Sequence, residues 1–141
     1  MRFSFSTLYV RNLDESLSFY EEVLVLRLIR RFSAGPEVEI AFLGEEGSEI
    51  ELVQDASKEA YDVGTDVSWG FSVEDVQEQY DLLKAQRIPL LSEIIEPQPG
   101  VKFFFIEDPN GFRIQLIEEA PRLSAPAHPR VTGHHSQCSA T

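Results

Sequence analysis

The chain has 141 residues, with 24 acidic side chains against 12 Lys and Arg, so its formal net charge is −12. This length suits one compact domain, or two small half-domains that share a core. The acidic balance argues against a nucleic acid as partner, because contacts with phosphates need a basic patch. The sequence contains no run of about 18 apolar residues, so we expect no membrane-spanning helix and no membrane partner.

The N-terminus and the cysteine content indicate the compartment. Residues 1–10 hold one arginine but no long apolar stretch before a small-residue cleavage site, which predicts no signal peptide. Cys138 is the single cysteine and forms no internal disulfide, which fits a reducing compartment. We therefore expect a cytoplasmic protein.

Residues 121–141 differ in composition from the rest of the chain. They carry Arg122 and Arg130 but no acidic residue, so their charge is +2 and that of residues 1–120 is −14. They are rich in Pro, Ser, Ala and His and show no apolar periodicity. This composition predicts a flexible C-terminal tail.

The first half of the body has the pattern of a strand, a helix and three more strands. Residues 3–10 are aromatic and β-branched enough for a strand. Residues 11–24 predict a helix capped by Asn12 or Asp14, with an apolar stripe of Leu13, Leu17, Tyr20 and Leu24. Three strand-like runs follow, separated by the turns SAGP and GEEG; they span residues 26–32, 37–43 and 48–54.

The second half repeats this order. A strand at 66–73 precedes a helix at 74–87, and three strands follow at 88–94, 101–107 and 112–118. Each half is too small to bury a good core alone, so we expect the halves to pair. The sequence therefore predicts an α+β fold of two βαβββ modules, over residues 1–60 and 61–120, followed by the tail.

The two halves align with each other, and strand alternation then assigns the faces of each sheet. The run EIELV lies over RIQLI, which places Glu51 opposite Gln115, and the first strands place Phe5 opposite Ser68. Successive side chains of a strand point to opposite faces, so the Ile and Leu of each run face the helices and these four residues face the other side. A twisted, antiparallel-rich mixed sheet with helices outside curves into a trough, where we expect a ligand.

These features together resemble the glyoxalase/bleomycin-resistance/extradiol-dioxygenase group, the vicinal oxygen chelate superfamily. The resemblance rests on the doubled layout, the segment LYVRNLDESLSFYEEVL and the ending EDPNGFRIQLIEE, and it covers about residues 1–119. In character the chain is most similar to small bacterial lactoylglutathione lyase (glyoxalase I). The resemblance implies a glyoxalase-like fold and a homodimer, because the family usually builds its trough where four modules meet.

The resemblance also identifies the positions that hold a divalent metal in the metal-using members. There, four inward side chains from the first and last strand of each half, usually His, Glu and Gln, bind the ion. The matching positions here are Phe5, Glu51, Ser68 and Gln115. Phenylalanine has no donor atom, a serine hydroxyl is a poor ligand, and a glutamine amide cannot act as a base. We therefore predict no metal cofactor, no catalytic residue, and a hydrogen-bonding role for Gln115.

Three functions stay open from the sequence. The bleomycin-resistance branch suggests a metal-free protein that sequesters a small cationic or aromatic molecule, with Phe3, Phe5, Tyr9 and Phe104 as inward aromatic side chains. A glyoxalase I-like lyase or isomerase with an atypical site is the second reading, and only this one calls for a divalent metal. A structural or regulatory domain without a small ligand is the third. The candidate ligand-binding residues are Phe5, Glu51, Ser68, Arg113 and Gln115.

Simpler roles compete with ligand binding at these positions. Glu51 could lie on a solvated sheet face or pair with Arg113 across the trough, and Phe5 could serve only in packing. Replacement metal ligands from the tail, at His128, His134 and His135, and a nucleophilic Cys138 are disfavoured because the tail is not expected to be ordered.

Overall fold

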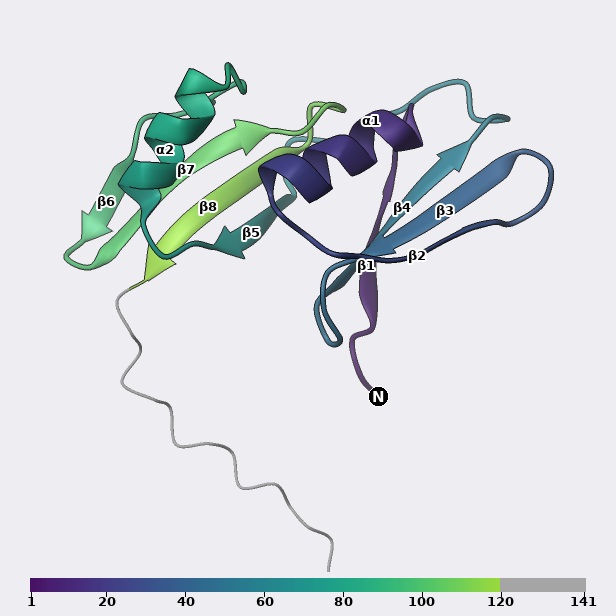
Figure 1. Cartoon of the computed structure of the whole chain (residues 1–141), viewed down its shortest axis with the longest axis horizontal. Helices are drawn as coiled ribbons and strands as arrows, with labels where there is room; N and C mark the ends of the chain where they lie inside the picture. The colour runs from purple at the N-terminus through teal and green to yellow at the C-terminus, as the bar shows by residue number, and fades with distance from the viewer. Residues whose placement is uncertain (120–141) are drawn as a thin grey trace, which may run out of the picture.

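The computed structural model describes residues 1–119, which form two four-stranded sheets with one helical segment each (Figure 1). In the first module the elements are β1 (Phe5–Tyr9), α1 (Leu13–Ser18), the π-helical turn η1 (Phe19–Val23), β2 (Leu28–Ser33), β3 (Val38–Leu43) and β4 (Glu49–Asp55). In the second they are β5 (Ser68–Ser72), α2 (Val76–Ala85), β6 (Ile95–Gln98), β7 (Val101–Glu107) and β8 (Arg113–Glu119). The predicted tail lies outside the described residues. No helix within residues 1–119 has the length and apolar character needed to cross a membrane.

The two sheets have the same topology and register, which confirms the predicted α+β fold. Their strand orders are β1-β4-β3-β2 and β5-β8-β7-β6, with β1 parallel to β4, β5 parallel to β8 and the remaining pairs antiparallel. Thr7 is opposite Glu51 in the first sheet, and Gly70 is opposite Gln115 in the second. The alignment of the two halves in the sequence is therefore also their alignment in space.

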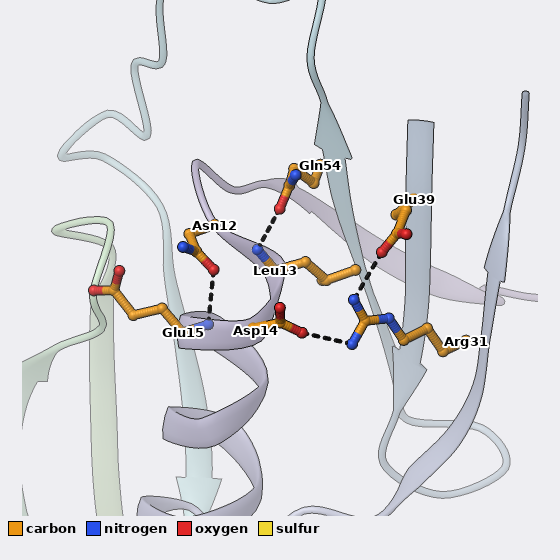
Figure 2. Close-up of polar contacts among 7 residues, drawn as sticks. All are labelled: Asn12, Leu13, Asp14, Glu15, Arg31, Glu39 and Gln54. Atoms are coloured by element: carbon orange, nitrogen blue, oxygen red, sulfur yellow. Dashed lines mark hydrogen bonds and ion pairs between the residues drawn. The ribbon is translucent and has the colours of Figure 1, made fainter. Parts of the chain in front are cut away.

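The start of α1 is attached to the first sheet by polar side chains (Figure 2). Asn12 is the N-cap and accepts a hydrogen bond from the Glu15 backbone N–H at 3.0 Å. Gln54 of β4 accepts another from the Leu13 N–H at 2.6 Å. Arg31 of β2 donates to Asp14 at 2.7 Å and also pairs with Glu39. The bonds from the Leu13 and Glu15 N–H groups satisfy donors that the helix itself leaves unpaired, and the contacts of Gln54 and Arg31 join the helix to the sheet.

The predicted helix at 11–24 is α-helical only in its first half. Phe19 to Val23 form a π-turn, in which the Leu24 N–H donates to the Phe19 carbonyl at 3.3 Å. After each helical segment, one residue has a left-handed backbone conformation. Val25 follows the N-cap Asn12 by thirteen positions, and Arg87 follows the N-cap Asp75 by twelve. The first module thus has one extra residue here, and a π-turn is the usual way for a helix to absorb such an insertion.

One core joins the modules on the helix side of the sheets. The buried cluster combines residues of both halves, including Leu13, Tyr20 and Leu52 from the first and Leu83, Phe104 and Ile114 from the second. Trp69 of β5 packs against Tyr20 with ring centroids 6.1 Å apart, and its indole N–H donates to Ser6 at 3.1 Å. Figure 1 shows the sheets side by side, with α2 over one of them and α1 near their junction. The two sheets thus share one core on their helix sides, and no helix covers their opposite faces within the described residues.

Two expectations in the second module were wrong. Residues 88–94 form only an isolated bridge, Leu90 to Ile106, and the fourth strand is β6 at 95–98. Pro89 lacks a ladder donor, and the Phe105 N–H bonds to the side-chain hydroxyl of Ser92 at 3.0 Å instead of a strand carbonyl. Phe104 points to the core rather than the trough, where its ring lies 5.2 Å from that of Tyr80.

Candidate functional site

The open face of the first sheet holds Glu51 in a defined place. Because Thr7 and Glu51 are direct neighbours across β1 and β4, the Thr7 hydroxyl donates to Glu51 Oε1 at 2.8 Å. The second carboxylate oxygen of Glu51 is therefore available as an acceptor for a ligand N–H or O–H. The carboxylate is oriented by the strand beside it.

An aromatic cluster lies next to this carboxylate. Phe42 of β3 is directly opposite Glu51, and its ring packs edge-on against Phe5 at 5.2 Å and parallel to Phe32 at 6.3 Å. The Arg30 guanidinium lies 4.0 Å above the Phe42 ring and 3.7 Å from Glu49. Phe5 is 42% exposed and Phe32 43%. Phe5 therefore packs within the face and also presents ring surface to a ligand.

The second sheet repeats the arrangement with different polar groups. Gln115 is opposite Gly70 on β5 and opposite Phe105 on β7. Because Gly70 has no side chain, the Gln115 amide lies over it; an added Cβ there would be 3.7 Å from Oε1. Ser68 is opposite Arg113, whose guanidinium lies 5.4 Å from the centre of the Phe105 ring.

In each module the chain itself places a cation over the aromatic ring that lies beside Glu51 or Gln115. Phe42 and Phe105 are equivalent by register, one beside Glu51 and the other beside Gln115, and each carries an arginine. These faces are already used in cation–π contacts, which weakens the expectation that the rings select a cationic ligand. Arg113 and Glu51 lie on different sheets and have these other partners, so the described contacts do not include the ion pair considered from the sequence.

The four matching positions all lie on sheet faces opposite the helices, as alternation requires. Phe5 and Glu51 share the first sheet, and Ser68 and Gln115 share the second. Ser68 lines a cavity of about 1140 Å³ whose described wall includes none of the other three. The meeting of both pairs in one cavity stays a prediction.

The donor set does not fit a divalent metal ion of the kind the resemblance implies. Glu51 is the one carboxylate among the four positions, and it already accepts a hydrogen bond from Thr7. Phe5 offers a ring packed on Phe42, and Ser68 and Gln115 offer neutral oxygens. Within residues 1–119, no three His, Cys, Asp or Glu side chains are placed together to hold an ion. The candidate tail ligands His128, His134 and His135, like Cys138, lie outside the described residues.

Sequence reasoning missed the residues that surround the four positions. Thr7, Arg30, Phe42 and Phe105 were not singled out, although they make the closest contacts on these faces. Phe42 and Phe105 stand at equivalent places before the last strand of each half, in IAFL and FFFI. This repetition in the sequence could have identified the aromatic residues beside Glu51 and Gln115.

Comparison with known proteins supports the relationship suggested by the sequence. The family model described as Glyoxalase/Bleomycin resistance protein/Dioxygenase superfamily matches residues 2–116. The chain is 34% identical over 128 residues to lactoylglutathione lyase of Haemophilus influenzae, covering 84% of this chain and 93% of that protein. It is 32% identical over 122 residues to the uncharacterized protein YwbC of Bacillus subtilis, covering 83% and 97%. The structure of a glyoxalase family protein from Bacillus cereus superposes with a TM-score of 0.74 at 23% identity, covering 85% and 95%.

Proposed function

Because the chain belongs to the glyoxalase/bleomycin resistance protein/dioxygenase superfamily, we propose that it uses the fold to bind a small organic molecule without a metal ion. The proposal rests on the kinds of side chain that the two open sheet faces present. Each has an aromatic ring with a guanidinium near its face, beside one hydrogen-bonding group, Glu51 or Gln115, at the positions where metal ligands would stand. Such a surface binds through ring contacts and a few oriented polar groups.

The chemistry of the faces favours a ligand with an aromatic ring and both donor and acceptor groups. The exposed edge of Phe5 supplies apolar contact, Glu51 accepts from a ligand donor, and Gln115 both donates and accepts. Gly70 leaves room beside Gln115 for the ligand to approach the backbone. A cationic group on the ligand would pair with Glu51 rather than with a free ring face.

The proposal includes a homodimer in the cytoplasm. The two halves of the candidate site lie on separate sheets, and β1 and β5 are each at the edge of a sheet. A second copy that closes both faces would bring Phe5 and Glu51 of one subunit toward the second-module residues of the other. The single cysteine, Cys138, is compatible with a reducing compartment.

A glyoxalase I-like lyase is the second candidate, and the similarity to the Haemophilus influenzae enzyme favours it. In that enzyme class a base removes a proton next to a polarised carbonyl, but Gln115 cannot accept a proton. This function would therefore need a site built differently from the four positions.

The test combines three measurements on purified protein: metal content, turnover of a hemithioacetal, and thermal shifts with a panel of small aromatic amines and aromatic carboxylates. We expect less than 0.1 metal per chain, no turnover, and a midpoint raised by a panel member, because a ligand of the folded form stabilises it. Phe5→Ala and Gln115→Ala should each remove that shift. Leu82→Ala, an exposed change on α2, should leave it unchanged.

The other outcomes decide between the alternatives. A full equivalent of bound metal, or turnover that Gln115→Ala abolishes, supports the lyase. No shift with any compound, together with no metal and no turnover, supports a domain without a small ligand.

A further inference from the structure

The turn between β7 and β8 contains an asparagine followed by a glycine, Asn110 and Gly111. The other asparagine of the chain, Asn12, precedes a leucine. A side-chain amide loses ammonia most readily before glycine, because glycine has no side chain to hinder attack by its own backbone nitrogen. Gly111 is exposed, and a Cβ built on it would meet no atom within 4 Å, so the turn is open to water. The DPNG turn therefore carries a reactive amide that the proposed function does not use.

Deamidation at this turn needs only water and hydroxide as reactants. The backbone N–H of Gly111 gives its proton to hydroxide, and the nitrogen attacks Cγ of Asn110. A carbon–nitrogen bond forms, the bond from Cγ to Nδ2 breaks, and Nδ2 leaves as ammonia after taking a proton from water. The product is a cyclic succinimide. Water then opens this ring at either carbonyl, which yields an aspartate or an isoaspartate at position 110.

In the folded chain, hydrogen bonds hold both reacting groups. Nδ2 of Asn110 donates to the Ser16 hydroxyl at 3.2 Å and to Asp108 Oδ2 at 3.1 Å. Oδ1 of the same amide accepts from the Arg11 backbone N–H at 3.2 Å. The Gly111 N–H, which would become the nucleophile, donates to the Asp108 carbonyl at 3.0 Å. Ring closure has to break these bonds, so the folded structure opposes the reaction.

Two of these partners belong to the first module, so the protection depends on contact between the modules. Ser16 lies on α1 and is 1% exposed, and Arg11 directly precedes the N-cap of that helix. Figure 1 shows the turn between β7 and β8 beside α1. Local opening of a protein costs less free energy than complete unfolding. Separation of α1 from the turn would therefore release the Asn110 amide while the two sheets stay folded.

The products of deamidation cannot restore the contact that suppressed it. An aspartate at position 110 has no N–H₂ group to donate, so Asp108 would lose one donor and would face a second carboxylate. Two carboxylates that share a site repel each other. An isoaspartate also lengthens the backbone of the turn, and β8 begins only two residues after Gly111, at Arg113. Either product therefore weakens the connection between α1 and the second sheet.

We infer that Asn110 is a site of spontaneous deamidation, that contact between α1 and the DPNG turn suppresses the reaction, and that the reaction prevents the contact from forming again. Asn110 is thus an ageing site, at which opening of the junction between the modules becomes permanent. The inference concerns the change of the chain with time and does not depend on the ligand proposed above.

The first test measures deamidation of the full chain by peptide mass spectrometry during incubation in mildly alkaline buffer. In urea, Asn110 should react about tenfold faster than Asn12 or more, because only Asn110 precedes glycine. Without urea, the reaction at Asn110 should be slower by about tenfold or more, because folding engages both reacting groups. Equal rates at the two asparagines in urea, or equal rates at Asn110 with and without urea, overturn the inference.

The second test weakens the junction from the side of the first module. Ser16→Ala removes one partner of the Asn110 amide and should speed deamidation of the folded chain about threefold to tenfold. Tyr20→Phe removes a donor to Asp108 and should act in the same direction, so the test does not depend on the folding of a single variant. Ser33→Ala, at an exposed position of β2, should leave the rate unchanged. If neither junction variant accelerates the reaction, contact with α1 does not suppress it.

The third test examines the product. Asn110→Asp reproduces the charge of one product, and we expect a lower urea midpoint and amide hydrogen exchange in α1 that is about tenfold faster or more. Asn12→Asp adds the same charge at the other asparagine but keeps the cap acceptor, so both measurements should stay near wild type. Deamidated wild type, separated by ion-exchange chromatography through its additional negative charge, should behave like Asn110→Asp. Wild-type exchange in α1 of both the variant and the deamidated chain would show that the product does not open the junction.

Discussion

The Tyr20 hydroxyl of the first module donates a hydrogen bond of 2.9 Å to Asp108 of the second module. Both side chains are buried, and Asp108 also accepts the backbone N–H groups of Asn110 and Phe112 at 2.9 and 2.7 Å. The Asn110 amide reaches the hydroxyl of Ser16 on α1 at 3.2 Å. The DPNG turn, whose sequence signals only a tight turn, is therefore a buried polar connection between the two modules.

Removing the Tyr20 hydroxyl should destabilise the chain without breaking the turn. In Tyr20→Phe, Asp108 loses one donor but keeps those of Asn110 and Phe112, so we expect a loss of about 1–2 kcal/mol in the free energy of unfolding. Urea denaturation measures it. Tyr9→Phe is the matched control, since the Tyr9 ring is 45% exposed; its stability should stay within about 0.5 kcal/mol of wild type. Equal effects of the two changes would contradict the role of the buried bond.

Alkaline pH should destabilise the wild type more than Tyr20→Phe. Burial, and then the charge and hydrogen bond of Asp108, raise the pKa of Tyr20 well above its ordinary value. The unfolded chain ionises this tyrosine near pH 10, whereas the folded chain keeps it neutral, so above pH 10 the folded state binds the additional proton. Stability that is present below pH 10 is thus lost as the pH rises. Thermal midpoints from pH 8.5 to 11 should fall more steeply for the wild type, and identical slopes would rule out this linkage.

The sequence predicted what local periodicity determines and missed what distant contacts determine. The two-residue period of EIELV and RIQLI was sufficient to place Glu51 and Gln115 on open faces, and the register confirms it. The end of the first helix was wrong, because Phe19 to Val23 form a π-turn, and the extra residue that it accommodates shifts the positions that face the core. The strand expected at 88–94 was wrong because the Ser92 hydroxyl took the place of a backbone acceptor, which no pattern in the sequence shows.

The sequence predicted the positions of the candidate site residues but not the side chains that contact them. The resemblance identified Phe5, Glu51, Ser68 and Gln115, whereas the partners of these residues come from strands far away in the sequence. The Arg30 guanidinium reaches Phe42 across the β2–β3 pair because the bulge between Leu28 and Arg30 shifts the register. A shift of one residue in an edge strand cannot be read from alternation alone.

The N-cap of α1 should contribute measurably to stability. Asn12→Ala removes the acceptor for the Glu15 N–H, and we expect a loss of about 1 kcal/mol in the free energy of unfolding. Asn12→Asp keeps an acceptor in the same place and should cost less than about 0.5 kcal/mol. Chemical denaturation of both variants measures the difference. A loss of the same size in both would show that the amide N–H₂ group, and not the cap oxygen, is what matters.

Restoring metal ligands tests whether the four positions meet in one cavity. The triple variant Phe5→His, Ser68→His and Gln115→Glu, together with the native Glu51, would present two imidazoles and two carboxylates. If the two pairs converge when subunits associate, we expect the variant to bind about one Ni²⁺ or Zn²⁺ per site, because four good ligands in one place are enough for a stable complex. Isothermal titration calorimetry and metal analysis after dialysis provide the measurement.

The single changes are the controls for this experiment. Each adds one ligand to Glu51, and two ligands rarely compete with water and buffer, so none should retain metal after dialysis. Activity need not follow, because the neighbours that would orient the new histidines are absent from the sequence. A folded, dimeric triple variant that binds no metal would show that Phe5 and Glu51 do not share a cavity with Ser68 and Gln115. The ligand would then have to be sought on one sheet at a time.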